Sequence, residues 1–159
     1  MMFKYPLEEL LSLRLHRVDE AILEHKRVFN ALNNAVLATK RAKEDLENYK
    51  IYKEEETERR YLSIKGKTLT QKELEKFRNN LSYLNIKELD LLEAVQKAIK
   101  EEEKLRTDEA KAKEGIVLAK KALTKLEEHK KIVYVSYKME EERLLDAEME
   151  DFQVKKNSF

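Results

Sequence analysis

The stretch that decides the fold is KGKTLTQKEL, residues 65–74. Its Gly66 suits the left-handed backbone conformation with which many helices end. Further on, Thr70 and Glu73 have the T-x-x-E spacing of a capping box, in which each side chain accepts a hydrogen bond from the other residue's backbone N–H. Leucines stand directly before Thr70 and directly after Glu73, the spacing of a hydrophobic staple. The stretch therefore predicts a helix end, a turn at residues 65–70 and a new helix start.

Long helical segments flank this turn. No Gly or Pro interrupts residues 7–64. Pro6 suits the first helical position, because its missing N–H would have no partner there. We expect one helix over about residues 7–64 and a second over about 71–152, followed by a frayed tail at 153–159. The whole chain, residues 1–159, would then form a single elongated coiled-coil hairpin.

Apolar residues in both segments repeat at alternating spacings of three and four, which is the pattern of a left-handed coiled coil. In the second segment 17 of 23 positions are apolar: Leu74, Phe77, Leu81, Leu84, Glu88, Leu91, Val95, Ala98, Glu102, Leu105, Glu109, Ala112, Ile116, Ala119, Leu123, Leu126, Lys130, Val133, Tyr137, Glu140, Leu144, Ala147 and Asp151. In the first segment eight of 11 are apolar: Leu11, Leu15, Val18, Ile22, His25, Phe29, Leu32, Val36, Thr39, Lys43 and Leu46. The predicted fold is all-α, with two long helices in an antiparallel coiled-coil hairpin.

The short connection sets which residues face each other. If the helices fold back at residues 65–70, the numbers of paired residues sum to about 138. On this register Lys50 faces Glu88, and the start of the first helix faces the region near residue 131. Residues 132–152 would then lack a partner helix. Their apolar stripe is either a surface for a partner or a solvated, frayed helix end.

Composition excludes several classes of protein. Charged residues make up 41% of the chain, against about 25% in a typical domain. Two Gly and one Pro are too few for a β-sandwich or an α/β sheet, and the absence of Cys excludes disulfides and Cys-bound metals. Basic and acidic residues number 13 and 12 in residues 1–65, 7 and 5 in 66–100, and 13 and 15 in 101–159. Without a segregated basic block, we expect no nucleic-acid partner.

The sequence also argues against membrane insertion. The longest apolar run has four residues, Ile132 to Val135, against about 18 in a membrane span. The N-terminal stretch lacks the apolar core and cleavage site of a signal peptide. With no such signal and no Cys, we expect a cytoplasmic location.

No motif points to catalysis. Gly66-Lys67-Thr68 resembles the end of a phosphate-binding loop, but Tyr61 stands where that pattern requires Gly. The three His lack the spacings of helical metal sites. Acids at core positions, such as Glu88 and Glu102, fit pairing with lysines across the helix interface, because two helices alone offer no pocket for acid–base chemistry. We predict no catalytic residue, no metal, no cofactor and no enzyme activity.

Aromatic residues gather on both sides of the turn: Tyr49, Tyr52, Tyr61, Phe77 and Tyr83. They are either local core or a docking patch. We expect Tyr52 and Tyr83 to be the most exposed of them.

The stretch YPLEELLSLR at residues 5–14, followed by RVDEA at 17–21, resembles the opening of the type III secretion central-stalk family. This is the YscO family, whose flagellar relative is FliJ. The layout of two long helices, one polar break and no Cys is also similar, as is the start of the second helix at residues 70–88.

The resemblance implies an antiparallel coiled coil that acts as the axle of a rotary ATPase. Its termini would enter the pore of a hexameric secretion ATPase, and its tip would face the export gate. Some members of the family also bind export chaperones, and some are themselves exported. The implied ATPase-binding residues are Tyr5, Leu7, Leu11, Arg14, Arg17, Val133, Tyr134, Tyr137 and Leu144. The implied gate-binding residues are Tyr49, Tyr52, Phe77, Leu81 and Leu84.

One departure from the flagellar pattern affects the tip. Leu84 and then Glu88 continue the second helix where a flagellar-type tip shows a small or polar residue, so the individual gate contacts stay open. An axle is expected to be a monomer on its own, at the cytoplasmic face of the secretion apparatus.

Two other functions fit a long helical hairpin. One is a structural spacer that self-associates through its unpaired stripe and is therefore a dimer. The other is a chaperone-like module that holds many unfolded clients. Oligomeric state separates the first from an axle, and binding selectivity separates the second.

Overall fold

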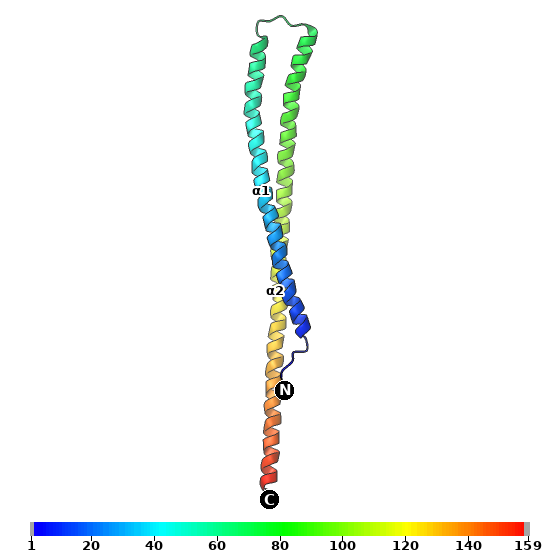
Figure 1. Ribbon diagram of the computed structural model, residues 1–159, viewed down its shortest axis with the longest axis vertical. Helices are drawn as coiled ribbons and strands as arrows, with labels where there is room; N and C mark the ends of the chain where they lie inside the picture. Colours follow the sequence, from blue (N-terminus) through cyan, green and yellow to red (C-terminus); the bar gives the residue numbers. More distant parts are fainter. Residues whose placement is uncertain (1, 158–159) are drawn as a thin grey trace. The chain divides into compact units, whose positions relative to one another are not determined.

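A computed structural model of the chain describes residues 2–157. Within them, α1 spans Glu8–Ile64 and α2 spans Gln71–Asn157, joined by the short segment at one end of Figure 1. Helix α2 therefore continues beyond residue 152, where the sequence predicted a frayed tail. Lys155 and Lys156 lie in its last turn, where positive charge interacts favourably with the helix dipole.

The turn has the predicted capping geometry. Gly66 adopts a φ of 77°, the left-handed conformation that a side chain would disfavour. The N–H of Glu73 donates to Thr70 Oγ1 at 3.3 Å, and the N–H of Thr70 donates to Glu73 Oε2 at 3.4 Å. These reciprocal bonds confirm the capping box and satisfy backbone donors that the first turn of a helix leaves unpaired.

Two compact units make up the chain, and each contains one piece of α1 and one piece of α2. Unit 1 is Met1–His25 with Lys111–Phe159, and unit 2 is Lys26–Ala110. Within each unit, contacts join residues of α1 to residues of α2 that run in the opposite direction. The antiparallel hairpin predicted from the sequence is confirmed.

The pairing register agrees closely with the predicted one. In unit 2, the rings of Tyr61 and Phe77 lie 5.2 Å apart, and their numbers sum to 138. In unit 1, Lys130 Nζ lies 3.0 Å from Glu8 Oε2, again with a sum of 138. One predicted pair is wrong: Lys53 rather than Lys50 meets Glu88, with 2.5 Å between Nζ and Oε2.

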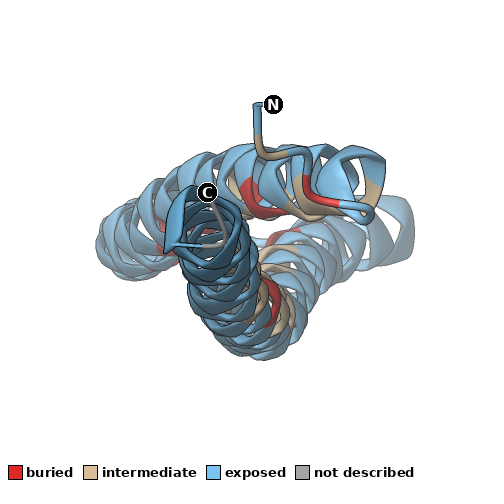
Figure 2. Ribbon diagram, turned by 90° about the horizontal axis from the view of Figure 1, so that it is seen from below, coloured by how far each residue is buried: buried red, intermediate tan, exposed pale blue. Residues whose placement is uncertain are grey.

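The interface between the helices is narrow, and most of the ribbon in Figure 2 is exposed. On α2, every residue of the predicted series from Phe77 to Tyr137 is buried or half-buried, which confirms that series over this range. Leu74 and the series members after Tyr137 are exposed, so the predicted series is too long at both ends.

On α1, only alternate members of the predicted series face the partner helix. Six are buried or half-buried: Leu11, Val18, His25, Leu32, Thr39 and Leu46. The other five are exposed, and the residue before each one faces inward instead. The inward residues are Arg14, Ala21, Val28, Ala35 and Ala42. Three of these five are alanines, which let two helix backbones approach closely and leave the larger neighbours on the flank.

Candidate functional site

The N-terminal segment before α1 packs along α2 within unit 1. The ring centroid of Phe3 lies 5.2 Å from that of Tyr134 and 5.2 Å from that of Tyr137. Tyr5 is buried, and its hydroxyl makes a 2.5 Å hydrogen bond with Nδ1 of His129. The segment thus covers part of α2 that the start of α1 does not reach.

Charged groups also hold the N-terminal segment against α2. Lys130 Nζ pairs with Glu8 and lies 5.9 Å from the centroid of the Tyr5 ring, within reach of a cation–π attraction. One prediction is corrected here: the unpaired part of α2 begins after Tyr137 rather than at residue 132. His129 is exposed and still holds the Tyr5 hydroxyl.

Sequence reasoning missed Phe3 as a contact residue. A signal was present, because Phe3 and Tyr5 alternate with Lys4. In an extended segment, residues two apart point to the same side, so both rings can lie on one helix.

The last part of α2 is exposed throughout. Every residue from 138 to 157 is exposed, and Figure 1 shows this end of α2 continuing past the N-terminus. The large apolar side chains among them are Met139, Leu144, Leu145, Met149, Phe152 and Val154. Residues 140–151 also hold seven acidic residues and one basic residue. This segment, which we call the α2 end (residues 138–157), offers a surface that is both apolar and acidic.

The implied ATPase-binding residues lie in different settings. Tyr134 and Leu144 are exposed, as are Leu7 and Arg17. Half-buried positions are taken by Leu11, Val133 and Tyr137. Arg14 is also half-buried, and its Nη1 donates to the carbonyl of Ala122 at 2.8 Å. Tyr5 is buried. The structure brings Tyr5, Tyr134 and Tyr137 together around Phe3 and His129.

The implied gate-binding residues in unit 2 serve mostly as core. Tyr49 and Leu84 are buried, and the Tyr49 hydroxyl donates to the Leu84 carbonyl at 2.8 Å. Phe77 and Leu81 are half-buried. Tyr52 is exposed, with its ring centroid 5.8 Å from that of Tyr49. Tyr83 is exposed too, at 63%, but Tyr61 at 53% exceeds Tyr52 at 48%, so the expected ranking is confirmed for Tyr83 and wrong for Tyr52.

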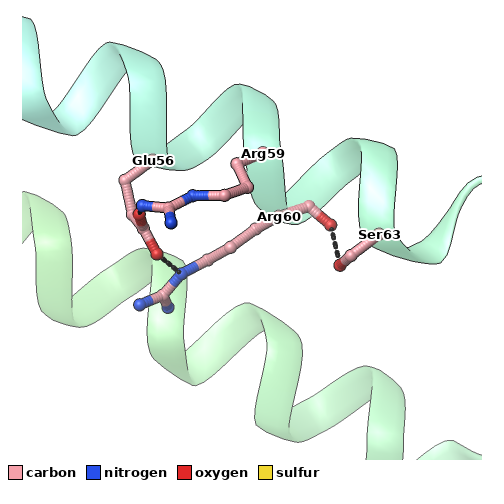
Figure 3. A network of polar contacts seen from close by, with 4 residues as sticks. All are labelled: Glu56, Arg59, Arg60 and Ser63. Carbon is pink, nitrogen blue, oxygen red and sulfur yellow. Dashed lines mark hydrogen bonds and ion pairs between the residues drawn. The ribbon is translucent and has the colours of Figure 1, made fainter.

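Between these aromatics and the turn, the inward face of α1 is polar. Arg59 and Arg60 both reach Glu56, and Arg60 Nε donates to Glu56 Oε1 at 3.0 Å (Figure 3). The hydrogen bond from Arg60 lowers the pKa of Glu56, and the charge and hydrogen bond of Arg59 add to the effect. All three residues lie on α1, so these ion pairs stabilise that helix itself and do not join it to α2.

An open hollow adjoins this polar stretch, lined by Lys50, Lys53, Glu54, Thr57, Glu58, Tyr61 and Glu88. Its ionisable groups have opposite charges; Lys53 and Glu88 are half-buried, and the others are exposed. Among residues 2–157, no group of three or more His, Asp or Glu side chains could hold a metal ion. No helix in that range is long and apolar enough to cross a membrane.

Comparison with solved structures gives a match to the crystal structure of the type III secretion protein YscO from Vibrio parahaemolyticus. The TM-score is 0.88, the sequences are 24% identical, and the alignment covers 92% of each chain. At this identity the likeness concerns the fold, and it agrees with the two-helix hairpin described above. A search of the curated proteins found no match.

A family model extends the comparison to sequence. The model for the type III secretion protein YscO matches residues 7–155, nearly the whole chain. The match includes both helices, the capped turn and most of the α2 end. The protein therefore belongs to the YscO family of type III secretion proteins.

Proposed function

We propose that this chain is the central stalk of a type III export apparatus. Its N-terminal segment and α2 end enter the pore of the hexameric secretion ATPase, and its turn faces the export gate. The stalk acts at the cytoplasmic face of the apparatus, without a cofactor or a reaction of its own. Export chaperones are further partners that the family resemblance implies.

The α2 end is the observation that carries this proposal. A run of 20 exposed residues, 138–157, keeps its helical form with large apolar side chains in solvent. Exposed apolar surface of this kind is typical of a contact with another protein. Its acidic residues would attract a basic pore lining and exclude partners with acidic surfaces.

The residues near the turn give weaker support for the proposed contact with the export gate. Of the five implied gate-binding residues, Tyr52 is the one whose side chain is exposed. Tyrosine offers a large contact area at a low cost in conformational entropy. We therefore assign the gate contact to Tyr52 first, and to the half-buried Phe77 and Leu81 second.

The test compares two double variants of α2 with matched chemistry. Leu144→Ser with Leu145→Ser alters the α2 end, and Val117→Ser with Leu118→Ser alters equally exposed positions elsewhere in unit 1. Stimulation of the cognate ATPase should be lost in the first variant and kept in the second. Equal stimulation by both variants would contradict the assignment of the α2 end.

A second experiment tests which end of the stalk contacts the ATPase and which end contacts the export gate. Tyr52→Ala should keep ATPase stimulation and impair export, measured as hydrolysis and secretion in parallel. If Tyr52→Ala abolishes stimulation while the Leu144 and Leu145 variant does not, the orientation of the stalk is reversed.

A further inference from the structure

Five basic residues surround the turn of unit 2: Lys65, Lys67, Lys72, Lys76 and Arg78. All five are exposed. In the part of the chain that the structure describes, none of them has a carboxylate within salt-bridge distance. They lie in the loop and in the first eight residues of α2, a distance of about 12 Å along the helix axis. We call this cluster the basic turn.

Charge counts over long stretches of sequence do not reveal this cluster. Lys65 belongs to residues 1–65 and the other four to residues 66–100, where the acids at 88, 90 and 93 offset their charge. Those acids lie well down α2, more than a Debye length of about 8 Å from the loop. Residues 65–78 alone hold five basic residues against Glu73 and Glu75, so the charge that is balanced over the longer intervals is positive in this short stretch.

Glu73 and Glu75 stand among the residues of the basic turn and Glu58 lies beside the turn, so residues 65–78 carry five positive and two negative charges. Glu73 accepts the Thr70 N–H in the capping box. Glu56 binds Arg59 and Arg60, so those two arginines are neutralised and do not belong to the cluster. Beyond Arg78, residues 79–86 carry no charge. The basic turn thus keeps a net positive charge.

Apolar side chains stand exposed among these cations. Leu62 is 61% exposed, and Tyr61 and Leu74 are exposed too. Four to eight Lys and Arg residues together with exposed apolar side chains are typical of surfaces that bind anionic lipid headgroups. Each cation near such a surface adds to the attraction, and the apolar side chains enter the interface.

We propose that the basic turn docks on the anionic phospholipid headgroups of a membrane surface, without spanning the bilayer. The hollow beside the turn, lined by Glu58, Tyr61, Leu62, Ile64 and Lys65, favours this partner over an acidic protein segment. Because Glu58 and Lys65 both line it, the hollow offers no net charge to an acidic peptide. Headgroups need no such hollow, since they meet the cations at a flat surface. This contact does not involve the ATPase, and it adjoins the proposed gate contact, because Phe77 lies between Lys76 and Arg78.

The test is flotation of the full chain with vesicles of phosphatidylcholine alone or mixed with phosphatidylglycerol. Binding is expected only to the mixed vesicles and should weaken as salt is added. Lys65→Glu with Lys67→Glu and Lys72→Glu should weaken it at least about tenfold, since each lysine near the surface contributes. Lys120→Glu with Lys121→Glu and Lys125→Glu makes the same charge change at exposed positions of unit 1 and should bind as the wild type does.

Circular dichroism of each variant shows whether the helices are retained. A milder variant with Gln in place of the same three turn lysines should weaken binding less than the Glu variant. The proposal would be overturned if the wild-type protein did not bind the mixed vesicles. It would also be overturned if the control variant and the turn variant lost vesicle binding equally. Turn-dependent binding of soluble poly-glutamate without vesicle binding would overturn it too, and would assign the basic turn to an acidic protein segment.

Discussion

Tyr49 fixes the pairing of α1 with α2 near the turn through one buried hydroxyl. Its hydroxyl donates to the Leu84 carbonyl, and burial raises the pKa of the phenol above its ordinary value of 10.0. Burial favours the neutral phenol of Tyr49 over the charged phenolate. The stability that its hydrogen bond contributes is therefore present below about pH 10 and is lost as the pH rises through the raised pKa.

Removal of that hydroxyl tests its contribution. Tyr49→Phe should lower the free energy of unfolding by about 1 kcal/mol at neutral pH, the usual net value of one hydrogen bond. Urea denaturation measures the change, with Tyr52→Phe as the control because the Tyr52 side chain is exposed. The Tyr49→Phe variant should also lose less stability than the wild type in alkaline solution. A loss as large in Tyr52→Phe as in Tyr49→Phe would contradict this account.

Glu56 gives a second prediction at the scale of one side chain. Its pKa is lowered chiefly by the hydrogen bond from Arg60. A depressed carboxyl pKa favours the folded state above the ordinary pKa, and that contribution disappears as the pH falls through the lowered value. Arg60→Gln should raise the Glu56 pKa towards its ordinary value, as read from the pH dependence of the carboxyl carbon shift in NMR. An unchanged titration of Glu56 would mean that Arg60 does not hold it in solution.

At the scale of the element, α1 and α2 differ in how far their sequences predict their buried faces. On α2 the strict spacing of three and four selects the buried residues from Phe77 to Tyr137, even though apolar neighbours such as Leu92 and Leu118 stand beside the series. On α1 a large apolar residue often follows a smaller one, as Ile22 follows Ala21 and Val36 follows Ala35. A prediction from apolar spacing places the larger residue of each such pair at the interface. Close packing of two helices instead favours the smaller one there.

Two valines of α1 test which face is buried. Val28 is 5% exposed, and Val36 is 38% exposed. Val28→Ala should lower the free energy of unfolding by about 2 kcal/mol, since it removes buried methyl groups and leaves a cavity. Val36→Ala removes the same atoms from a partly solvated site and should cost well under half as much. Thermal unfolding of both variants measures the difference. If Val36→Ala lowers the free energy of unfolding more than Val28→Ala does, the face of α1 predicted from the sequence is the one that is buried.

At the scale of the whole molecule, the sequence predicted the fold class, the turn and the register, because these depend on local caps and on apolar spacing. The candidate site was less predictable. The packing of Phe3 on α2 joins residues more than 130 positions apart, and no local rule encodes a contact of that separation. The basic turn, by contrast, lies within residues 65–78 and can be found in the sequence when the charges of that short stretch are counted by themselves.

The hairpin also bears on oligomeric state. Apart from the α2 end, each helix has its partner within the same chain, so we predict that the purified protein is a monomer. Light scattering on the eluting peak at micromolar concentration measures this. A stable dimer would favour the self-associating spacer instead, with the exposed apolar residues of the α2 end, such as Leu144 and Leu145, as the first candidates for its interface.

The capped turn has a consequence for the order in which the chain folds. Contacts between the two arms of the hairpin join residues 16 positions apart at Tyr61 and Phe77 and 35 apart at Tyr49 and Leu84. The contact of the N-terminal segment at Tyr5 with His129 joins residues 124 apart. Each contact formed near the turn shortens the loop that the next one must close, so the entropic cost of every further step stays small. We expect folding to begin at residues 65–73 and to spread away from them. Opening should run in reverse, and amide hydrogens near Tyr5 should exchange with solvent long before those near Tyr49.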